Sequence, residues 1–185
     1  MRTILGIDPG TNLLGFGIVR VDGTGRPSFV DMGVLDLRKE KDGYVKLRRI
    51  FEKVGALCDL HHPDDLAVES PFYGHNAQVI LKLGRAQGAA MMAALSRGIP
   101  VFEYAPRKAK MAICGNGAAS KEQVSLMLQK TLGVKLEDKF LDATDALAIA
   151  MCHFYELNNP LAGASTKGGW EKFLADHPER IAKQV

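Results

Sequence analysis

The stretch TILGIDPGTNLLGFGIVRV, residues 3–21, decides the fold, because Pro9 and Gly10 separate two apolar runs within it. β-Branched and aromatic residues favour strands, and Pro-Gly is typical of a turn, so 3–8 and 13–21 are predicted to form a hairpin. Residues 28–37 (SFVDMGVLDL) alternate roughly between apolar and polar side chains and predict a third strand. We therefore expect the chain to open with three consecutive strands.

Helices and strands are expected to alternate in the rest of the chain. Apolar residues recur at three-to-four spacing over 44–60 and predict an amphipathic helix. Short apolar runs at 65–70 and 99–104 predict two more strands, with a helix at 76–97 between them. Ser120 and Gln123 predict a capped helix start, and 141–157 predicts a buried helix. This order predicts an α/β protein with a mixed five-stranded central sheet flanked by helices, the ribonuclease-H-like plan among several doubly wound ones.

The size and composition of the chain fit a single domain. Its 185 residues, 46% of them hydrophobic, are enough to bury a core. We place this domain at 1–157 and expect a flexible tail at 158–185, which begins with a turn-rich stretch. A net charge of +3 permits a polyanionic partner without identifying one.

The sequence favours a cytoplasmic protein. Its three cysteines lack the dense spacing of a disulfide framework and form no CxxC motif, which fits a reducing compartment. The apolar run at the N-terminus is only a few residues long, so no signal peptide is expected. No uninterrupted apolar window of about 18 residues occurs, so no membrane span is expected.

Two acidic residues lie where predicted strands end. Asp8 closes the first strand and Glu69 closes the strand at 65–70. Asp8 fits a turn cap equally well, because an Asp before Pro-Gly accepts local backbone N–H bonds. A charge at the end of a buried strand otherwise needs a partner that offsets the cost of its burial.

Asp142 and Asp145 form a second acidic pair. On a helix their side chains share one face, about 4.5 Å apart along the axis, and their charges repel. Taken alone, the pair fits better an N-cap and a first-turn acid favoured by the helix dipole. Together with Asp8 and Glu69, however, these acids are costly unless divalent cations offset their repulsion, and hard oxygen ligands suit Mg²⁺ or Mn²⁺.

Such a site suits phosphodiester hydrolysis. Two metal ions can activate the attacking water and stabilise the leaving oxygen, so no histidine base is required. The five histidines, including His153 on an apolar helix, are accordingly expected to be structural or solvated. The four acids therefore predict a metal-dependent hydrolase.

The middle of the chain is basic. Between residues 82 and 121 there are seven basic side chains and one acid, Glu103. This excess suits DNA phosphates, although an ordinary solvated helix face explains it equally well. Phe72 and Tyr73 follow Glu69 in a loop bounded by Pro and Gly, where a ring could stack on bases or pack into the core. The basic residues are Lys82, Arg85, Arg97, Arg107, Lys108, Lys110 and Lys121.

Several collinear segments resemble the RuvC family of Holliday-junction resolvases, over residues 2–157. They are LGIDPG, AVES with PFYGHN, LKLGRAQG, PVFEYAPRKAK, GNGAASKEQV and DATDALAIA. The resemblance implies a ribonuclease-H-like homodimer that resolves four-way DNA junctions during homologous recombination and DNA repair. It also implies a magnesium-dependent cut in each of two opposing strands, and partnership with the RuvA and RuvB branch-migration proteins.

The resemblance also assigns residues. The four catalytic and metal-binding acids of the family fall on Asp8, Glu69, Asp142 and Asp145, with two Mg²⁺ per active site and Mn²⁺ as a substitute. The junction-probing aromatic of the family falls on Phe72, and its DNA-contacting lysines fall on Lys110 and Lys121. From the aromatic loop and the basic segment, we add Tyr73 and Arg107 as expected DNA contacts.

A dimer fits this activity, because two opposing strands need two active sites. The small-residue face of helix 76–97, comprising Gly84, Gly88, Ala89 and Ala93, is a candidate interface, with close packing onto the sheet as the alternative. Two other functions stay open, a ribonuclease-H-type nuclease of other specificity and a non-cleaving junction-binding protein. An actin-like kinase is less suited, since that fold duplicates the unit for which this chain has room once.

Overall fold

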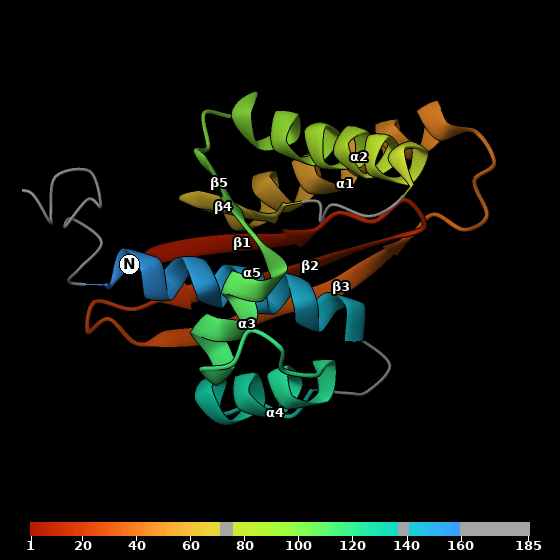
Figure 1. Cartoon of the computed structure of the whole chain (residues 1–185). Coiled ribbons are helices and arrows are strands. Elements are labelled where there is room, and N and C mark those ends of the chain that lie inside the picture. Colours follow the sequence, from red (N-terminus) through yellow and green to blue (C-terminus); the bar gives the residue numbers. More distant parts are fainter. Residues whose placement is uncertain (71–75, 137–140, 160–185) are drawn as a thin grey trace, which may run out of the picture. The chain divides into compact units, whose positions relative to one another are not determined.

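The structure is a computed structural model that describes residues 1–70, 76–136 and 141–159, without the side chains of 141 and 142. Strands β1 (Arg2–Asp8), β2 (Leu13–Val21) and β3 (Pro27–Asp36) form an antiparallel meander. Strands β4 (Asp65–Glu69) and β5 (Val101–Tyr104) extend the sheet parallel to β1, in the order β3-β2-β1-β4-β5 (Figure 1). The mixed five-stranded sheet predicted from the sequence is confirmed.

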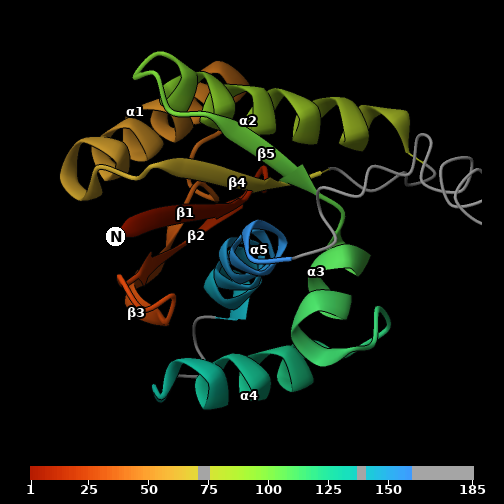
Figure 2. The same cartoon turned by 90° about the vertical axis from the view of Figure 1, so that its left-hand side faces the viewer.

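Helices cover both faces of this sheet (Figure 2). Helices α1 (Gly43–His61) and α2 (Ala77–Leu95) pack on one face, around a core that includes Leu5, Ile7 and Ile18. Helices α3 (Pro106–Cys114), α4 (Lys121–Leu132) and α5 (Leu141–Leu157) lie on the other face, where Ile4 and Val19 point. The strands thus bury alternate residues against two helical layers, as a doubly covered sheet requires.

Local sequence signals set the helix ends. The Ser120 hydroxyl accepts a hydrogen bond from the Gln123 backbone N–H at 3.3 Å, and the Gln123 side chain accepts one from Ser120 N–H at 2.9 Å, so the predicted capping box is confirmed. Gly133 ends α4 with a positive φ of 65°, which glycine adopts without strain. The fifth strand is shorter than predicted, 101–104 instead of 99–104, because Ile99 N–H bonds to Ala94 O at the end of α2.

Helix α5 lies unusually close to the sheet. A Cβ added at Gly6 would lie 2.1 Å from the carbonyl oxygen of Ala146, and one added at Gly17 would lie 2.6 Å from Leu147 Cα. Both glycines are on the central strands, so only their lack of a side chain lets the helix backbone approach. The N-terminal half of α5 is therefore seated directly over β1 and β2. Among the described residues, no helix is both long enough and apolar enough to cross a membrane.

Candidate active site

The strand register brings Asp8 and Glu69 to the same edge of the sheet. Strands β1 and β4 are parallel neighbours in which Ile7 pairs with Val68, so Asp8 and Glu69 are the next residues on adjacent strands. Asp8 is followed by a tight Pro9-Gly10 turn, where a Cβ on Gly10 would lie 1.9 Å from Leu13 O. The sequence places these acids at strand ends, and the pairing places them side by side.

Helix α5 adds Asp145 to this edge. The backbone of Ala146 lies directly against Gly6, which is two residues before Asp8 on β1. Asp145, the residue before Ala146, is therefore near the end of β1. Asp145 is partly buried, and its Oδ2 lies 2.5 Å from Lys121 Nζ at the start of α4. The side chain of Asp142 lies outside the described residues. Three of the four predicted acids, Asp8, Glu69 and Asp145, are thus brought together.

The electrostatics of Glu69 show how close the convergence is. Burial, the largest cause, and the charges of Asp8 and Asp145 together raise the pKa of Glu69 to about 8, against the lowering effect of Lys121 and Lys110. The two lysines therefore do not fully offset the repulsion among the acids. The unfavourable charge that remains is what a bound divalent cation would neutralise.

The donor set fits a hard divalent cation. Carboxylate oxygens are preferred ligands of Mg²⁺ and Mn²⁺, whereas the described part of the site offers no soft sulfur ligand. Within the residues whose side chains are described, no three acids, histidines or cysteines are arranged to enclose a metal ion. Asp142 is outside that set, and Asp145 is engaged by Lys121.

Three of the five predicted DNA contacts are described, and all lie on the face that carries α5. Lys121 begins α4, and Lys110 on α3 is near enough to Glu69 to lower its pKa. Arg107, also on α3, packs over the next loop, since a Cβ on Gly117 would lie 2.5 Å from Arg107 Cγ. The other two predicted contacts, Phe72 and Tyr73, lie outside the described residues.

The basic segment 82–121 does not form one surface. Lys82 and Arg85 are exposed on α2, which covers the opposite face of the sheet from α3 and α4. Arg97 is engaged by Asp59, with Nε–Oδ1 and Nη2–Oδ2 distances of 2.6 and 2.8 Å. Sequence order suggested a single patch, but the turn from α2 into β5 divides it.

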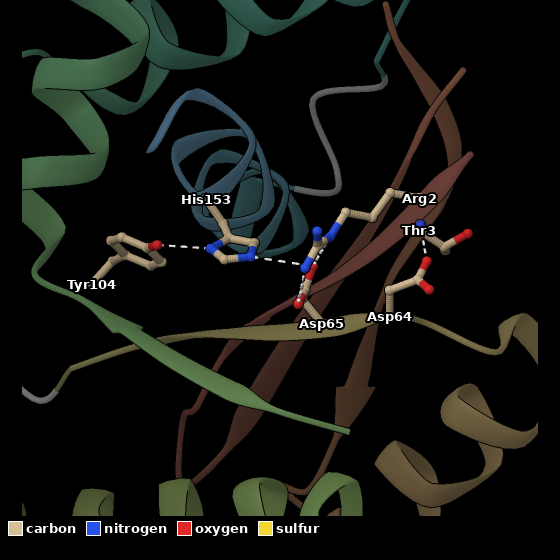
Figure 3. A network of polar contacts seen from close by, with 6 residues as sticks. All are labelled: Arg2, Thr3, Asp64, Asp65, Tyr104 and His153. Atoms are coloured by element: carbon tan, nitrogen blue, oxygen red, sulfur yellow. Dashed lines mark hydrogen bonds and ion pairs between the residues drawn. The ribbon is translucent and has the colours of Figure 1, made fainter. Parts of the chain in front are cut away.

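A buried polar network that the sequence did not reveal links the sheet to α5 (Figure 3). The Tyr104 hydroxyl and His153 Nδ1 are 2.7 Å apart, and His153 Nε2 lies 3.4 Å from Asp65 Oδ2. Arg2 forms a bidentate pair with Asp65, which is fully buried. Burial acts to raise the pKa of Asp65, but the hydrogen bond and charge of Arg2, with those of His153, lower it overall. Since Tyr104 pairs with Glu69 across β5 and β4, the network fixes the strand beside the acids.

Two further side chains support the edge of the sheet. Lys46 Nζ on α1 donates to Thr11 O and Asn12 Oδ1, both at 2.9 Å, and so ties down the loop after Asp8. Gln87 on α2 is buried and donates to Glu103 Oε2 at 2.8 Å. Each pair is separated by at least 16 residues, so local sequence patterns carry no signal for them.

A mixed sheet with acids at the ends of two adjacent parallel strands and on a helix that crosses them defines a nuclease of the ribonuclease-H-like class. Comparison with known families agrees. The model of the family described as "Crossover junction endodeoxyribonuclease RuvC" matches residues 4–153, so this chain belongs to the RuvC family. The resemblance seen in the sequence is confirmed.

Relatives support the assignment over nearly the whole chain. The RuvC of Bacteroides fragilis is 54% identical over 97% of this chain and 96% of its own length, and that of Porphyromonas gingivalis is 48% identical over 97% of both. Among solved structures, Thermus thermophilus RuvC in complex with a Holliday junction substrate is 35% identical, with a TM-score of 0.77 over 84% of this chain and 94% of that one. A yeast mitochondrial Holliday junction resolvase shares the fold at 13% identity, with a TM-score of 0.63 over 89% of this chain and 83% of that one.

Proposed function

We propose that this chain resolves four-way DNA junctions by metal-assisted hydrolysis of one phosphodiester in each of two opposing strands. The observation that carries this proposal is the convergence of Asp8, Glu69 and Asp145 at one edge of the sheet, in a member of the RuvC family. The process it serves is homologous recombination and DNA repair, which we place in the cytoplasm.

Asp8, Glu69, Asp142 and Asp145 are the proposed ligands of two Mg²⁺ ions, for which Mn²⁺ can substitute. Bound there, the ions supply an activated water and a counter-charge for the leaving oxygen. Because Glu69 is buried beside Asp8, its pKa is raised, and binding of a cation would be coupled to release of the Glu69 proton. Lys121 and Lys110 add positive charge next to the acids, where the phosphate to be cut would lie.

Five further residues are the proposed DNA contacts. Arg107, Lys110 and Lys121 lie on α3 and α4 and suit backbone phosphates. Phe72 and Tyr73 are proposed to contact bases at the crossover. They follow Glu69 so closely in sequence that a base contact there would position the adjoining phosphate at the acids.

A homodimer is proposed to supply the second active site. On α2, Leu81, Gly84, Gly88, Met92 and Leu95 recur at three- and four-residue spacing and so share one helix face. Leu81, Met92 and Leu95 are about half exposed, and a Cβ on Gly84 or Gly88 would meet nothing within 4 Å. The two glycines therefore face outward, whereas Ala93 is buried in the core, so only part of the predicted small-residue face is available to a partner.

The dimer can be tested without disturbing the protomer. Gly88→Arg introduces a long side chain into open space and should give monomers in sedimentation velocity at micromolar concentration. Ala56→Arg, on the exposed surface of α1, is the matched control and should stay dimeric. A monomeric wild-type protein would refute this part of the proposal.

RuvA and RuvB are the proposed protein partners, and residues 158–185 are proposed as a tail outside the nuclease domain at 1–157.

The activity is tested with a mobile four-way junction and a linear duplex of the same sequence, each with Mg²⁺ or EDTA. Paired symmetric nicks on the junction alone, and only with Mg²⁺, are expected. Asp8→Asn should abolish cutting and retain binding, because it removes a ligand charge with little change in volume. Glu52→Gln, an exposed acid on α1, is the control. Equal cutting of the linear duplex would favour a nuclease of other specificity, and binding without cutting would favour a junction-binding protein.

A further inference from the structure

A second group of basic residues lies near the acids, on the face of the sheet that α1 and α2 cover. A cavity of about 490 Å³ opens between the β1–β2 loop, the N-terminal end of α1 and the first half of α2. Its lining includes Thr11, Asn12, Lys41, Lys46, Lys82 and Arg85. We call it the α1–α2 cleft.

The charge of the α1–α2 cleft is entirely positive. Four of its lining residues are basic, and no acidic residue among the described ones lines it. Lys46 is committed to the loop after Asp8, through Thr11 O and Asn12 Oδ1. The other three, Lys41, Lys82 and Arg85, are exposed and form no ion pair within the described part of the chain. Like charges left unpaired around a hollow repel one another, which a polyanion would relieve.

The position of the cleft points to the same polyanion as the active site. Thr11 and Asn12 follow Asp8 within four residues, in the loop that joins β1 to β2. The N-terminal ends of α1 and α2 lie at this same edge of the sheet, to the right in Figure 1. Lys110 and Lys121 lie near the acids on the α3–α4 side, so cations flank the acids on both sides.

The geometry points to the α1–α2 cleft as a second phosphate-binding track, in which Lys41, Lys82 and Arg85 contact the backbone of the junction strand that leaves the active site on the α1–α2 side. This inference rests on the proposed function. Its role is positioning, because backbone contacts set the register of DNA without reading its sequence. Tyr44, 80% exposed at the rim of the cleft, is placed to stack on a sugar or base of that strand.

The test measures junction binding by fluorescence anisotropy in EDTA, over a range of salt concentrations, so that cutting does not interfere. The variants are Lys82→Gln, Arg85→Gln and both together. Arg26→Gln, in the β2–β3 turn at the far end of the sheet, removes the same charge away from the cleft. Each lost phosphate contact should lower the slope of log affinity against log salt by about 0.9, and should weaken binding roughly fivefold to tenfold at 0.1 M salt.

The outcomes separate this inference from the proposed function. A double variant whose slope falls by about twice the single-variant change, with Arg26→Gln unchanged, supports the cleft as a phosphate track. A double variant whose junction affinity and salt slope equal those of the wild type would overturn the inference that the cleft binds DNA phosphates. A wild-type protein that fails to bind the junction refutes the proposed function itself. Equal melting temperatures and sedimentation coefficients for all variants exclude an indirect effect through folding or dimerisation.

Discussion

Helix α5 packs so closely against Gly6 that replacing this glycine with alanine is enough to displace the acids. In Gly6→Ala the new Cβ would lie 2.1 Å from Ala146 O, whereas ordinary contacts begin at 3.4 Å. The difference, roughly 1.3 Å, is the distance by which the helix has to move away from β1. Asp145 precedes Ala146 and moves with it. A misplacement of about 1 Å can cost about 100-fold in rate, and overpacking costs about 1–3 kcal/mol of stability.

Single-turnover cleavage of the four-way junction measures this effect. Gly6→Ala should cut roughly 100-fold more slowly than wild type while binding the junction with similar affinity. Gly17→Ala, whose Cβ would lie 2.6 Å from Leu147 Cα, requires a smaller shift and should lose less activity, which provides a milder variant if Gly6→Ala is unstable. Gly23→Ala, with nothing within 4 Å, should behave as wild type. Normal cleavage rates in both Gly6→Ala and Gly17→Ala would refute the reasoning.

Three other outcomes are expected. The folded-state pKa of Glu69 is raised to about 8 from the ordinary 4.5, so the metal-free protein should lose stability as pH rises from about 4.5 to 8. Chemical denaturation should show a loss of up to about 1.4 kcal/mol per pH unit relative to Glu69→Gln, and a difference in unfolding free energy that does not change with pH would contradict this. Tyr104→Phe removes the hydrogen bond between the Tyr104 hydroxyl and His153 Nδ1 and should cost about 1–3 kcal/mol, whereas Tyr44→Phe on the surface should cost nothing. Equal unfolding midpoints for Tyr104→Phe and the wild type would contradict a stabilising role for this network. EDTA should stop cutting but leave junction gel shifts in place, and cutting that persists in EDTA would exclude a metal requirement.

The sequence predicts the elements of the fold well because their signals are local. The Pro9-Gly10 turn, the Ser120 and Gln123 capping box and the strand-ending acids all depend on residues within a few positions of one another. The acids could also be grouped in advance, because a charge at the end of a buried strand needs a partner. What the pattern could not supply was the register that sets Asp8 beside Glu69.

Features that join distant segments were not predictable from local patterns. Tyr104 and His153 are 49 residues apart, and periodicity indicated only that His153 lies on an apolar helix. The α1–α2 cleft draws its cations from two segments of the chain, residues 41–46 and 82–85. Conversely, contiguity along the sequence was misleading for Lys82 and Lys121, which lie on elements covering opposite faces of the sheet. Pairing, packing and chain reversal decide these arrangements.

The central claim is that Asp8, Glu69 and Asp145 act as one electrostatic unit that a divalent cation completes. A ¹³C NMR titration of the Glu69 carboxyl tests it directly, in metal-free wild type, in Asp8→Asn and with Mg²⁺ added. The account predicts a wild-type pKa near 8 that falls in Asp8→Asn, and ionisation at lower pH once Mg²⁺ is bound. A wild-type pKa near the ordinary 4.5, or a raised pKa that responds neither to Asp8→Asn nor to Mg²⁺, would contradict it.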